Sequence, residues 1–279
     1  MNYIKKMYIL RLKIYQPNAH YRIPFTYQRR HTYPIPPYST IIGLLLNILG
    51  IYWQGEVENA PEEYKKLRKI KISISGRFKT KTTEYIWYRN LSKDEHLKRF
   101  GTYENRIFSG NVEHFGYQMP TKIDILNDVN LLIHLAHKDK NFIQNIKQNL
   151  ENPNKRLDII HLGRAEDWLI FEEISEIKEL NENWILNKCP DKNYKLFFWI
   201  PEKMWLNEKN YDFKKFDGLE YRITTFWKIK DFEKTMNRNG YRLFEFVRVK
   251  LNDGLIKTEN PCIFDKEVNT PVFLLNMEV

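Results

Sequence analysis

The chain has few cysteines and no long apolar run. Its 279 residues include only Cys189 and Cys262, which cannot build a disulfide framework or a zinc site. The longest apolar stretch, Ile41 to Tyr52, is shorter than the roughly 20 residues that a membrane helix needs. Residues 1–15 lack the small-residue cleavage site of a signal peptide. We therefore expect a cytoplasmic protein that makes no membrane contact.

Motifs for metal, nucleotide or nucleophilic chemistry are also absent from the sequence. It contains no glycine-rich phosphate loop, no nucleophile elbow and no cluster of metal ligands, so we expect neither a cofactor nor a bound metal. The seven histidines are scattered, and His134 lies in an apolar segment, as a core histidine would. The carboxylates of Glu166 and Asp167 have no evident catalytic partner, which favours a role in a turn or an interface.

Positive charge is concentrated in the first part of the chain. The net charge of +10 divides into +12 for residues 1–100, zero for residues 101–160 and −2 for residues 161–279. This asymmetry favours binding of a polyanion by the N-terminal part. The alternative interpretation is a solvated, lysine-rich surface.

The first 80 residues alternate between strand-like and helix-like patterns. Lys6–Tyr15 has apolar residues at every second position and predicts a strand. The five prolines between Gln16 and Pro37 exclude a helix there. Ser39 or Thr40 is expected to cap a helix that ends at Gly50, and Leu67–Phe78 predicts a second strand.

A long polar and aromatic excursion separates these elements from the next strand. It runs from Lys79 to Met119, with strand-like pieces at Glu84–Arg89 and Arg106–Gly116. Asp128–His137 then predicts a third core strand, and Leu157–Leu162 a fourth short strand. Between them Phe142, Ile146 and Leu150 recur every four residues, which indicates a short amphipathic helix.

The order of these elements predicts an α+β fold. Strand, helix, strand, strand, helix, strand is the pattern of a ferredoxin-like domain, which RNA-recognition (RRM) domains also use. We assign it to residues 1–165, with the excursion at about 79–119 inserted between two of its strands. Short strands recur from Ile170 onward, so we interpret residues 166–279 as a β-rich C-terminal module.

The basic segment after the first strand is the main candidate for RNA contact. Its cations would bind phosphates, and the tyrosines between them would stack on splayed bases. The start of the following helix offers free amides to a phosphate, although plain capping explains Ser39 and Thr40 equally well. We expect Gly43, within that helix, to serve close packing. The predicted RNA-binding residues of this segment and the helix start are His20, Tyr21, Arg22, Arg29, Arg30, His31, Tyr33, Ser39 and Thr40.

The same segment leaves a catalytic alternative open. His20 and His31, with nearby tyrosines and lysines, are the residue types of a metal-independent ribonuclease, in which an imidazole moves the proton of a 2′-hydroxyl. We favour the binding interpretation, with no catalytic residues. A third hypothesis is a scaffold subunit whose main partners are proteins.

Several of these motifs together resemble a known family. They are Ala19-His20-Tyr21-Arg22-Ile23-Pro24, then Thr32-Tyr33-Pro34-Ile35-Pro36-Pro37-Tyr38-Ser39-Thr40-Ile41-Ile42-Gly43-Leu44-Leu45, then Ile48-Leu49-Gly50, and later His161-Leu162-Gly163-Arg164-Ala165-Glu166. They are similar to the motifs of the Cas-five family of CRISPR-associated proteins, which are RAMP proteins, and the form of the motifs is similar to the type I-B branch. The resemblance covers the N-terminal half well and the C-terminal half only by length and β content.

The resemblance implies a role in antiviral defence. A protein of this family holds the 5′ handle of the CRISPR RNA in a Cascade effector complex, and so meets target DNA only indirectly. It touches a Cas-seven backbone subunit and a Cas-eight-type large subunit, and a β-hairpin thumb emerges from its ferredoxin-like domain. The thumb would be the Lys79–Met119 excursion. The resemblance thus adds Lys79, Lys81, Arg89, Arg99, Arg106 and Arg164 to the predicted RNA-binding residues. In the type I-C branch the same protein cuts the precursor RNA. The type I-B branch leaves that cut to a separate nuclease.

Overall fold

The computed structural model describes residues 6–24, 26, 29–89, 107–108, 111–112, 118–206, 211–229 and 242–277. A ten-stranded, almost entirely antiparallel sheet forms its frame, with strand order β13-β14-β12-β3-β7-β1-β8 and with β2, β4 and β9 paired beside this path. No helix in these ranges is long and apolar enough to cross a membrane. The chain therefore has a mixed α/β, sheet-rich fold.

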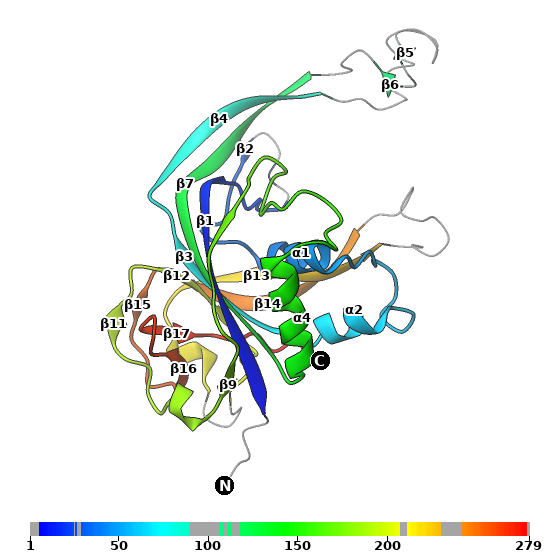
Figure 1. Ribbon diagram of the computed structural model, residues 1–279. Coiled ribbons are helices and arrows are strands. Elements are labelled where there is room, and N and C mark those ends of the chain that lie inside the picture. Colours follow the sequence, from blue (N-terminus) through cyan, green and yellow to red (C-terminus); the bar gives the residue numbers. More distant parts are fainter. Residues whose placement is uncertain are drawn as a thin grey trace.

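Four strands and two helices make up the centre of the molecule. Strands β1 (Met7–Ala19), β3 (Lys71–Arg77), β7 (Gln118–His137) and β8 (Ile170–Ile174) lie in the order β3-β7-β1-β8, and each pair is antiparallel. Helix α1 (Tyr38–Leu49) connects β1 to β3, and α4 (Lys140–Glu151) follows β7. Figure 1 shows both helices on the same side of these strands. The alternating pattern of the sequence correctly predicted β1, β3 and the second half of β7.

The helices show why their sequences form these elements. Nearly every side chain of α1 that points to the sheet is apolar and buried, and Gly50 ends the helix with φ of +70°. A Cβ at Gly50 would lie 2.6 Å from the carbonyl oxygen of Lys155, so only glycine fits there. The carboxylate of Asp139 caps α4, accepting hydrogen bonds from the amides of Asn141 and Phe142.

Strands from the second half of the chain extend the same sheet. β12 (Phe197–Pro201) pairs with β3, followed by β14 (Arg242–Asn252) and the edge strand β13 (Leu219–Ile229). β9 (Lys178–Leu180) pairs with the start of β1. The boundary predicted at residues 165 and 166 stays a prediction, and strands from both sides of it share one sheet.

Smaller elements complete the C-terminal part. β10 (Ile185–Leu186), β16 (Cys262–Asp265) and β17 (Thr270–Val272) form a three-stranded sheet, and β11 (Lys192–Asn193) pairs with β15 (Leu255–Ile256). They cover a second apolar core around Phe198, Phe216 and Phe273. Two 3₁₀ turns belong to the same part of the chain: Glu182–Trp184 precedes β10, and Phe213–Lys215 precedes β13.

A long curved hairpin projects from the sheet. β4 (Thr80–Arg89) pairs with the first half of β7, from Thr80 opposite Asn127 to Arg89 opposite Gln118, and the two strands rise away from the body as an arm (Figure 1). The short strands β5 (Ile107–Phe108) and β6 (Asn111–Val112) pair with each other between β4 and β7 in sequence. The paired part of the arm matches the base of the predicted excursion. The rest of the excursion predicted at Lys79–Met119 falls largely on residues outside the described ranges.

Buried charges tie the C-terminal part to the central strands. Arg11 on β1 donates to Asp265 on β16 (2.8 Å) and to Glu173 on β8. His134 on β7 lies 3.1 Å from the same Asp265 carboxylate. His134 is therefore the partnered core histidine that the sequence predicted.

Two local predictions were wrong, and one short helix was not predicted. Leu157–Leu162 is a loop, because Asn47 binds its backbone amides and the side chains of Leu157 and Ile159 face solvent; β8 takes the place of the fourth strand. Pro37, and neither Ser39 nor Thr40, occupies the N-cap of α1. Residues Glu62–Leu67 form a short helix, α2, that the sequence analysis did not predict.

Candidate nucleic-acid interface

The base of the arm carries a row of cations and aromatic rings on one face. Side chains alternate along a strand, so Lys81, Thr83, Tyr85 and Trp87 of β4 share a face. The register with β7 places Asp124 opposite Thr83 and Lys122 opposite Tyr85. We call this surface the arm-base face and include in it Arg29 and His31, whose side chains reach Asp124.

The basic segment before α1 reaches this face as a small hairpin. The amide of Ile23 donates to the carbonyl of His31 (2.8 Å), and the amide of Tyr33 donates to the carbonyl of Tyr21 (2.8 Å). Between the two sides of this hairpin, β2 (Arg29–Arg30) runs parallel to β7, with Arg29 beside Lys122. Two cations that are 93 positions apart in the sequence thus become neighbours.

One buried carboxylate holds the cations of the face in place. The Asp124 side chain is 1% exposed, and its Oδ1 accepts hydrogen bonds from Nε (3.1 Å) and Nη2 (2.9 Å) of Arg29. Its Oδ2 lies 2.9 Å from Nδ1 of His31 and 3.8 Å from Nζ of Lys81. Thr83 adds a weaker contact at 3.4 Å. Asp124 therefore connects β2, β4 and β7 at one point.

The electrostatics of this contact favour an ionised Asp124. Burial alone would raise the pKa of its carboxyl, but the hydrogen bonds from His31 and Arg29 and the charge of Lys81 outweigh burial and lower the pKa. One negative charge is thus shared among several cations, and the face keeps a positive balance. Roughly half of the Arg29 and His31 side chains remains exposed to solvent.

Two exposed aromatic rings continue the face along the arm. Tyr85 is 58% exposed and Trp87 is 53% exposed, and their rings meet edge to face at 5.9 Å between centroids. Lys122 is also exposed. Cations beside exposed rings are the elements of a single-stranded nucleic-acid surface, because phosphates pair with the cations and bases stack on the rings.

Three of the predicted contact residues lie in the core. Tyr21 donates its hydroxyl to Gln16, and Tyr33 packs edge to face against Trp199 and Tyr221. His20 is buried, with Nδ1 bound to the carbonyl oxygen of Asp124 (2.8 Å). Because a carbonyl only accepts, Nδ1 carries the proton, and burial lowers the pKa of this imidazole. The stacking predicted for the two tyrosines does not fit their positions.

Arg164 serves a different structural purpose. Its guanidinium binds Asp167, with Nη2 at 2.7 Å from Oδ1, and also meets Glu84 at 3.4 Å. Glu84 lies on the other face of β4, not on the face that carries Lys81. The turn requires Gly163 (φ +113°), because a Cβ there would lie 2.8 Å from the Asp167 carboxylate. Arg164 is therefore already engaged away from the arm-base face.

The remaining predicted residues are dispersed. The Ser39 hydroxyl bonds to Thr224 (2.6 Å), and Thr40 lines a pocket beside α1. Arg22 is exposed on the basic hairpin, Arg30 belongs to β2, and Lys79 is exposed 3.7 Å from Asp128. The side chain of Arg89 and the whole of Arg99 and Arg106 lie outside what the structure describes.

Sequence reasoning missed two residues that organise the face, Lys122 and Asp124. A signal was present, since both interrupt an apolar run and alternate with the buried Ile123 and Ile125. Among the described residues, no group of three or more histidine, cysteine or acidic side chains is placed to hold a metal ion.

Comparisons with known proteins agree on one group. The family model described as CRISPR-associated protein (Cas_Cas5) matches residues 9–255. A search of curated proteins found no match. Among solved structures, a chain of a "CRISPR RNA-guided surveillance complex" is similar with a TM-score of 0.50 and 12% identity, over 88% of this chain and 89% of that one.

Two further solved structures are similar at lower scores. One is titled "Crystal structure of Cas protein", with a TM-score of 0.45, 12% identity and coverage of 94% of this chain and 98% of that one. The other belongs to "Cryo-EM structure of the Type III-B Cmr-beta bound to cognate target RNA and AMPPnP, state 1", with a TM-score of 0.42, 11% identity and coverage of 88% and 86%.

Proposed function

The chain belongs to the CRISPR-associated Cas5 family, and from this premise we propose that it is a guide-RNA-binding subunit of a Cascade-type effector complex. The observation that carries the proposal is the arm-base face, where Asp124 orders Arg29, His31 and Lys81 next to exposed Tyr85 and Trp87. A single-stranded RNA segment is the ligand whose chemistry fits both halves of this surface.

On the arm-base face, charged side chains and aromatic rings contribute to binding in different ways. Arg29, Lys81 and Lys122 supply phosphate contacts, which position the strand without reading its sequence. Tyr85 and Trp87 offer ring faces to unstacked bases, each worth about 1–3 kcal/mol per base. Because Asp124 already fixes Arg29 in the free protein, less conformational entropy is lost when RNA binds.

We further propose that the bound segment is the 5′ handle of a CRISPR RNA in a type I-B-like complex. The strand order β3-β7-β1-β8 with α1 and α4 supports a ferredoxin-like arrangement. The arm is then the thumb that reaches the Cas-seven backbone subunit. This role rests on the family resemblance and on the projection of β4 and β7 from the body.

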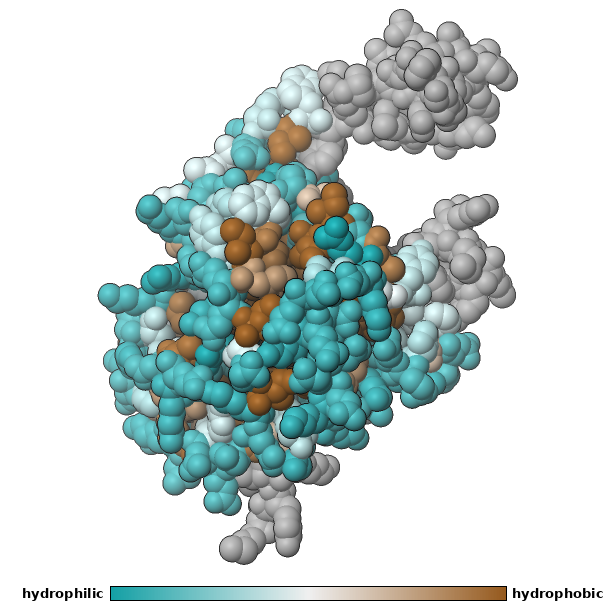
Figure 2. Space-filling model, viewed as in Figure 1, coloured by the Kyte–Doolittle hydropathy of each residue, from teal (hydrophilic) through white to brown (hydrophobic). Residues whose placement is uncertain are grey.

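An exposed apolar area supports a protein partner, which we propose to be the Cas-eight-type large subunit. Figure 2 shows a largely hydrophilic surface on which apolar side chains gather below the base of the arm. Leu157, Ile159, Trp168 and Ile170 are all exposed in the segment after α4. Apolar side chains grouped on a surface mark interaction sites more often than single ones do.

We propose that the protein binds RNA without cutting it. The burial of His20 supports this, because its unprotonated Nε2 is enclosed by protein and a 2′-hydroxyl would not reach it. The second candidate function, a metal-independent endoribonuclease, is favoured by one observation: His31 is half exposed beside Arg29 and Lys81. Repeat RNA incubated with the protein in EDTA separates the two, since a cleaved product would establish the nuclease.

Salt-dependent binding tests the proposed interface directly. Neutralising Z phosphates on a single strand gives a log–log slope of about −0.7Z. Lys81→Ala with Lys122→Ala should weaken binding of the repeat-derived handle and make the slope about 1.4 shallower. The matched control is Lys214→Ala with Lys215→Ala, two exposed lysines in the C-terminal part. Equal slopes for both double variants would contradict the arm-base face as the binding surface.

A further inference from the structure

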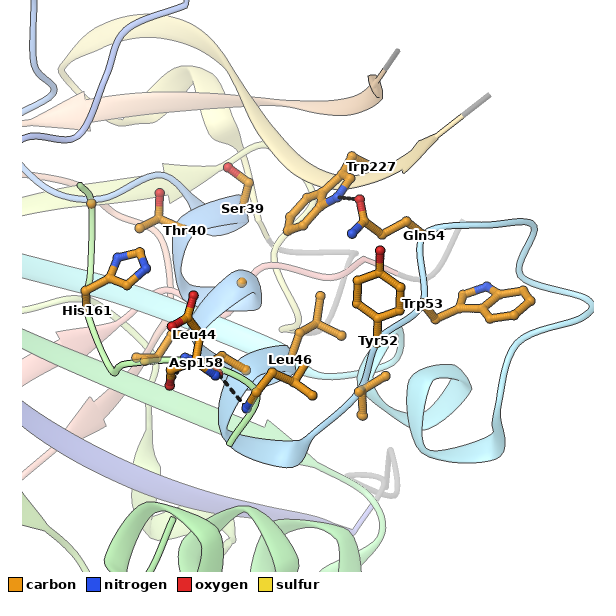
Figure 3. A pocket seen from close by; sticks show the side chains of 15 residues that line it. Ser39, Thr40, Leu44, Leu46, Tyr52, Trp53, Gln54, Asp158, His161 and Trp227 are labelled. Carbon is orange, nitrogen blue, oxygen red and sulfur yellow. Dashed lines mark hydrogen bonds between the residues drawn. The ribbon is translucent and has the colours of Figure 1, made fainter. Parts of the chain in front are cut away.

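A pocket beside helix α1 carries an inference that deepens the proposed function and rests on it. The pocket has a volume of about 380 Å³, which lies within the range of small-ligand sites. Figure 3 shows Thr40 and His161 at one end, with Tyr52, Gln54 and Trp227 at the other. Helix α1, the loop after it, β13 and the loop after α4 all contribute side chains.

The floor of the pocket contains a glycine without a packing reason. Gly43 lies in the middle of α1, where glycine is less favourable than alanine. Within 4 Å, a Cβ added there would meet only Cη2 of Trp227, at an ordinary contact distance of 3.6 Å. The expectation that Gly43 serves close packing is therefore wrong. What the missing side chain leaves is helix backbone beside the edge of the Trp227 ring.

The walls of the pocket are held firmly in the free protein. The indole Nε1 of Trp227 donates to Oε1 of Gln54 (3.3 Å), and the amide of Ile229 donates to the Gln54 carbonyl (2.6 Å). The Ser39–Thr224 hydrogen bond joins α1 to β13 beside the pocket. These contacts keep the ring of Trp227 next to Gly43.

The lining selects a flat, uncharged group with polar edges. Among the described residues that line the pocket there is no lysine or arginine, and Asp158 adds a carboxylate, so a phosphate is not the expected occupant. Nδ1 of His161 is buried without a hydrogen-bond partner in the described structure, and Thr40 places a hydroxyl nearby. Tyr52, which is 53% exposed, adds a second ring.

We propose that this pocket takes one unstacked base of the bound single-stranded RNA. The glycine floor lets a planar ring approach the helix, Trp227 and Tyr52 contact it, and the polar groups of Thr40, Gln54 and His161 meet its edges. The pocket wall is also joined to the arm, because Gly163 lines the pocket and the next residue, Arg164, reaches Glu84 on β4.

Gly43→Ala gives the sharpest test, because its two expected effects have opposite signs. Alanine is the better helix former, so Tm should rise by about 2 °C. The added methyl group occupies the floor, so affinity for labelled ten-nucleotide RNA, measured with oligo(A), oligo(C) and oligo(U), should fall about tenfold for the tightest of them. A ten-nucleotide abasic ribose-phosphate chain should bind both proteins equally.

Tyr52→Ala is the second variant and should also weaken only the base-bearing probes, whereas Leu255→Ala, an exposed residue of β15, is the control that should change nothing. Unchanged affinity in both pocket variants would overturn the inference and leave the proposed function standing. A lower Tm for Gly43→Ala would overturn it as well, since the glycine would then serve packing.

The remaining outcomes separate this inference from the function on which it rests. If the wild-type protein bound none of the probes, the proposed function would fail and the pocket assignment with it. If the variants kept their RNA affinity but lost partner subunits on co-purification, the pocket would receive a protein side chain, and the inference would be wrong.

Discussion

Replacing the Asp124 carboxylate by an amide tests the central contact of the arm-base face. Asp124→Asn keeps the size of the side chain and removes its charge. The buried carboxylate accepts two hydrogen bonds from Arg29 and one from His31, and lies 3.8 Å from Lys81. Bonds to charged groups contribute about 1.5–3 kcal/mol each when buried. Here the partners are half exposed, so the total loss should be about 2 kcal/mol.

This loss of stability has two measurable consequences. In a protein of this size, about 2 kcal/mol corresponds to a Tm lower by about 4–8 °C. Affinity for single-stranded RNA should also fall, although the variant has gained one unit of positive charge, because Arg29 and His31 are no longer held in position. Calorimetry and a binding titration at fixed salt measure the two effects.

The matched control is Asp128→Asn, on the same strand. Its side chain is 46% exposed, and the nearest cation, Lys79, is 3.7 Å away. It makes the same change in charge, and the residue has a positive φ that asparagine tolerates, so its Tm should change by less than about 2 °C. RNA affinity that rose equally in both variants would show that Asp124 acts only as a negative charge, and the positioning argument would be refuted.

Three other expected outcomes follow from the geometry. Trp87→Ala should weaken RNA binding about tenfold without changing Tm, because the ring is largely exposed, and Trp87→Phe should restore most of the affinity. Asp265→Asn should cost about 3 kcal/mol in urea unfolding, because it leaves the buried Arg11 guanidinium short of a partner; a change below 1 kcal/mol would mean that Glu173 and Glu267, its two other carboxylate partners, suffice. Burial lowers the pKa of His20, His134 and His137, so below about pH 6.5 the unfolded chain takes up protons before the folded one and stability falls. The urea midpoint should thus be lower at pH 5.5 than at pH 7.5, and a higher one would contradict the assignment of neutral buried imidazoles.

The sequence was informative where a pattern repeats at a fixed period. Alternation identified β1 and β3, and four-residue spacing identified α4, because each periodicity reflects a face that must be buried. The excursion after β3 followed from its length and polar composition, whereas its hairpin form followed from the family resemblance. These predictions needed no information about which segments meet in space.

The orientation of the basic segment was not predictable in the same way. Between Gln16 and Pro37 the prolines break any regular period, so no pattern indicates which side chains point inward. Tyr21 and Tyr33 are in the core because their rings fill space against Gln16 and Trp199, residues from other strands. Asp124 was missed for a related reason, since its partners come from positions 29, 31 and 81 and meet only through the register of three strands.

Net charge alone overstates how much of the N-terminal part attracts RNA. Several of its cations are already paired, among them Arg11 with Asp265, Arg68 with Glu245, and Lys66 with Asp139. These pairs stabilise the fold, and the acidic partner cancels most of the electrostatic attraction that each cation would exert on a ligand. At the arm-base face one carboxylate serves several cations, so positive charge remains after pairing. Whether the excess positive charge forms a binding surface depends on where the cations lie in the sheet. It also depends on how many cations share each buried carboxylate.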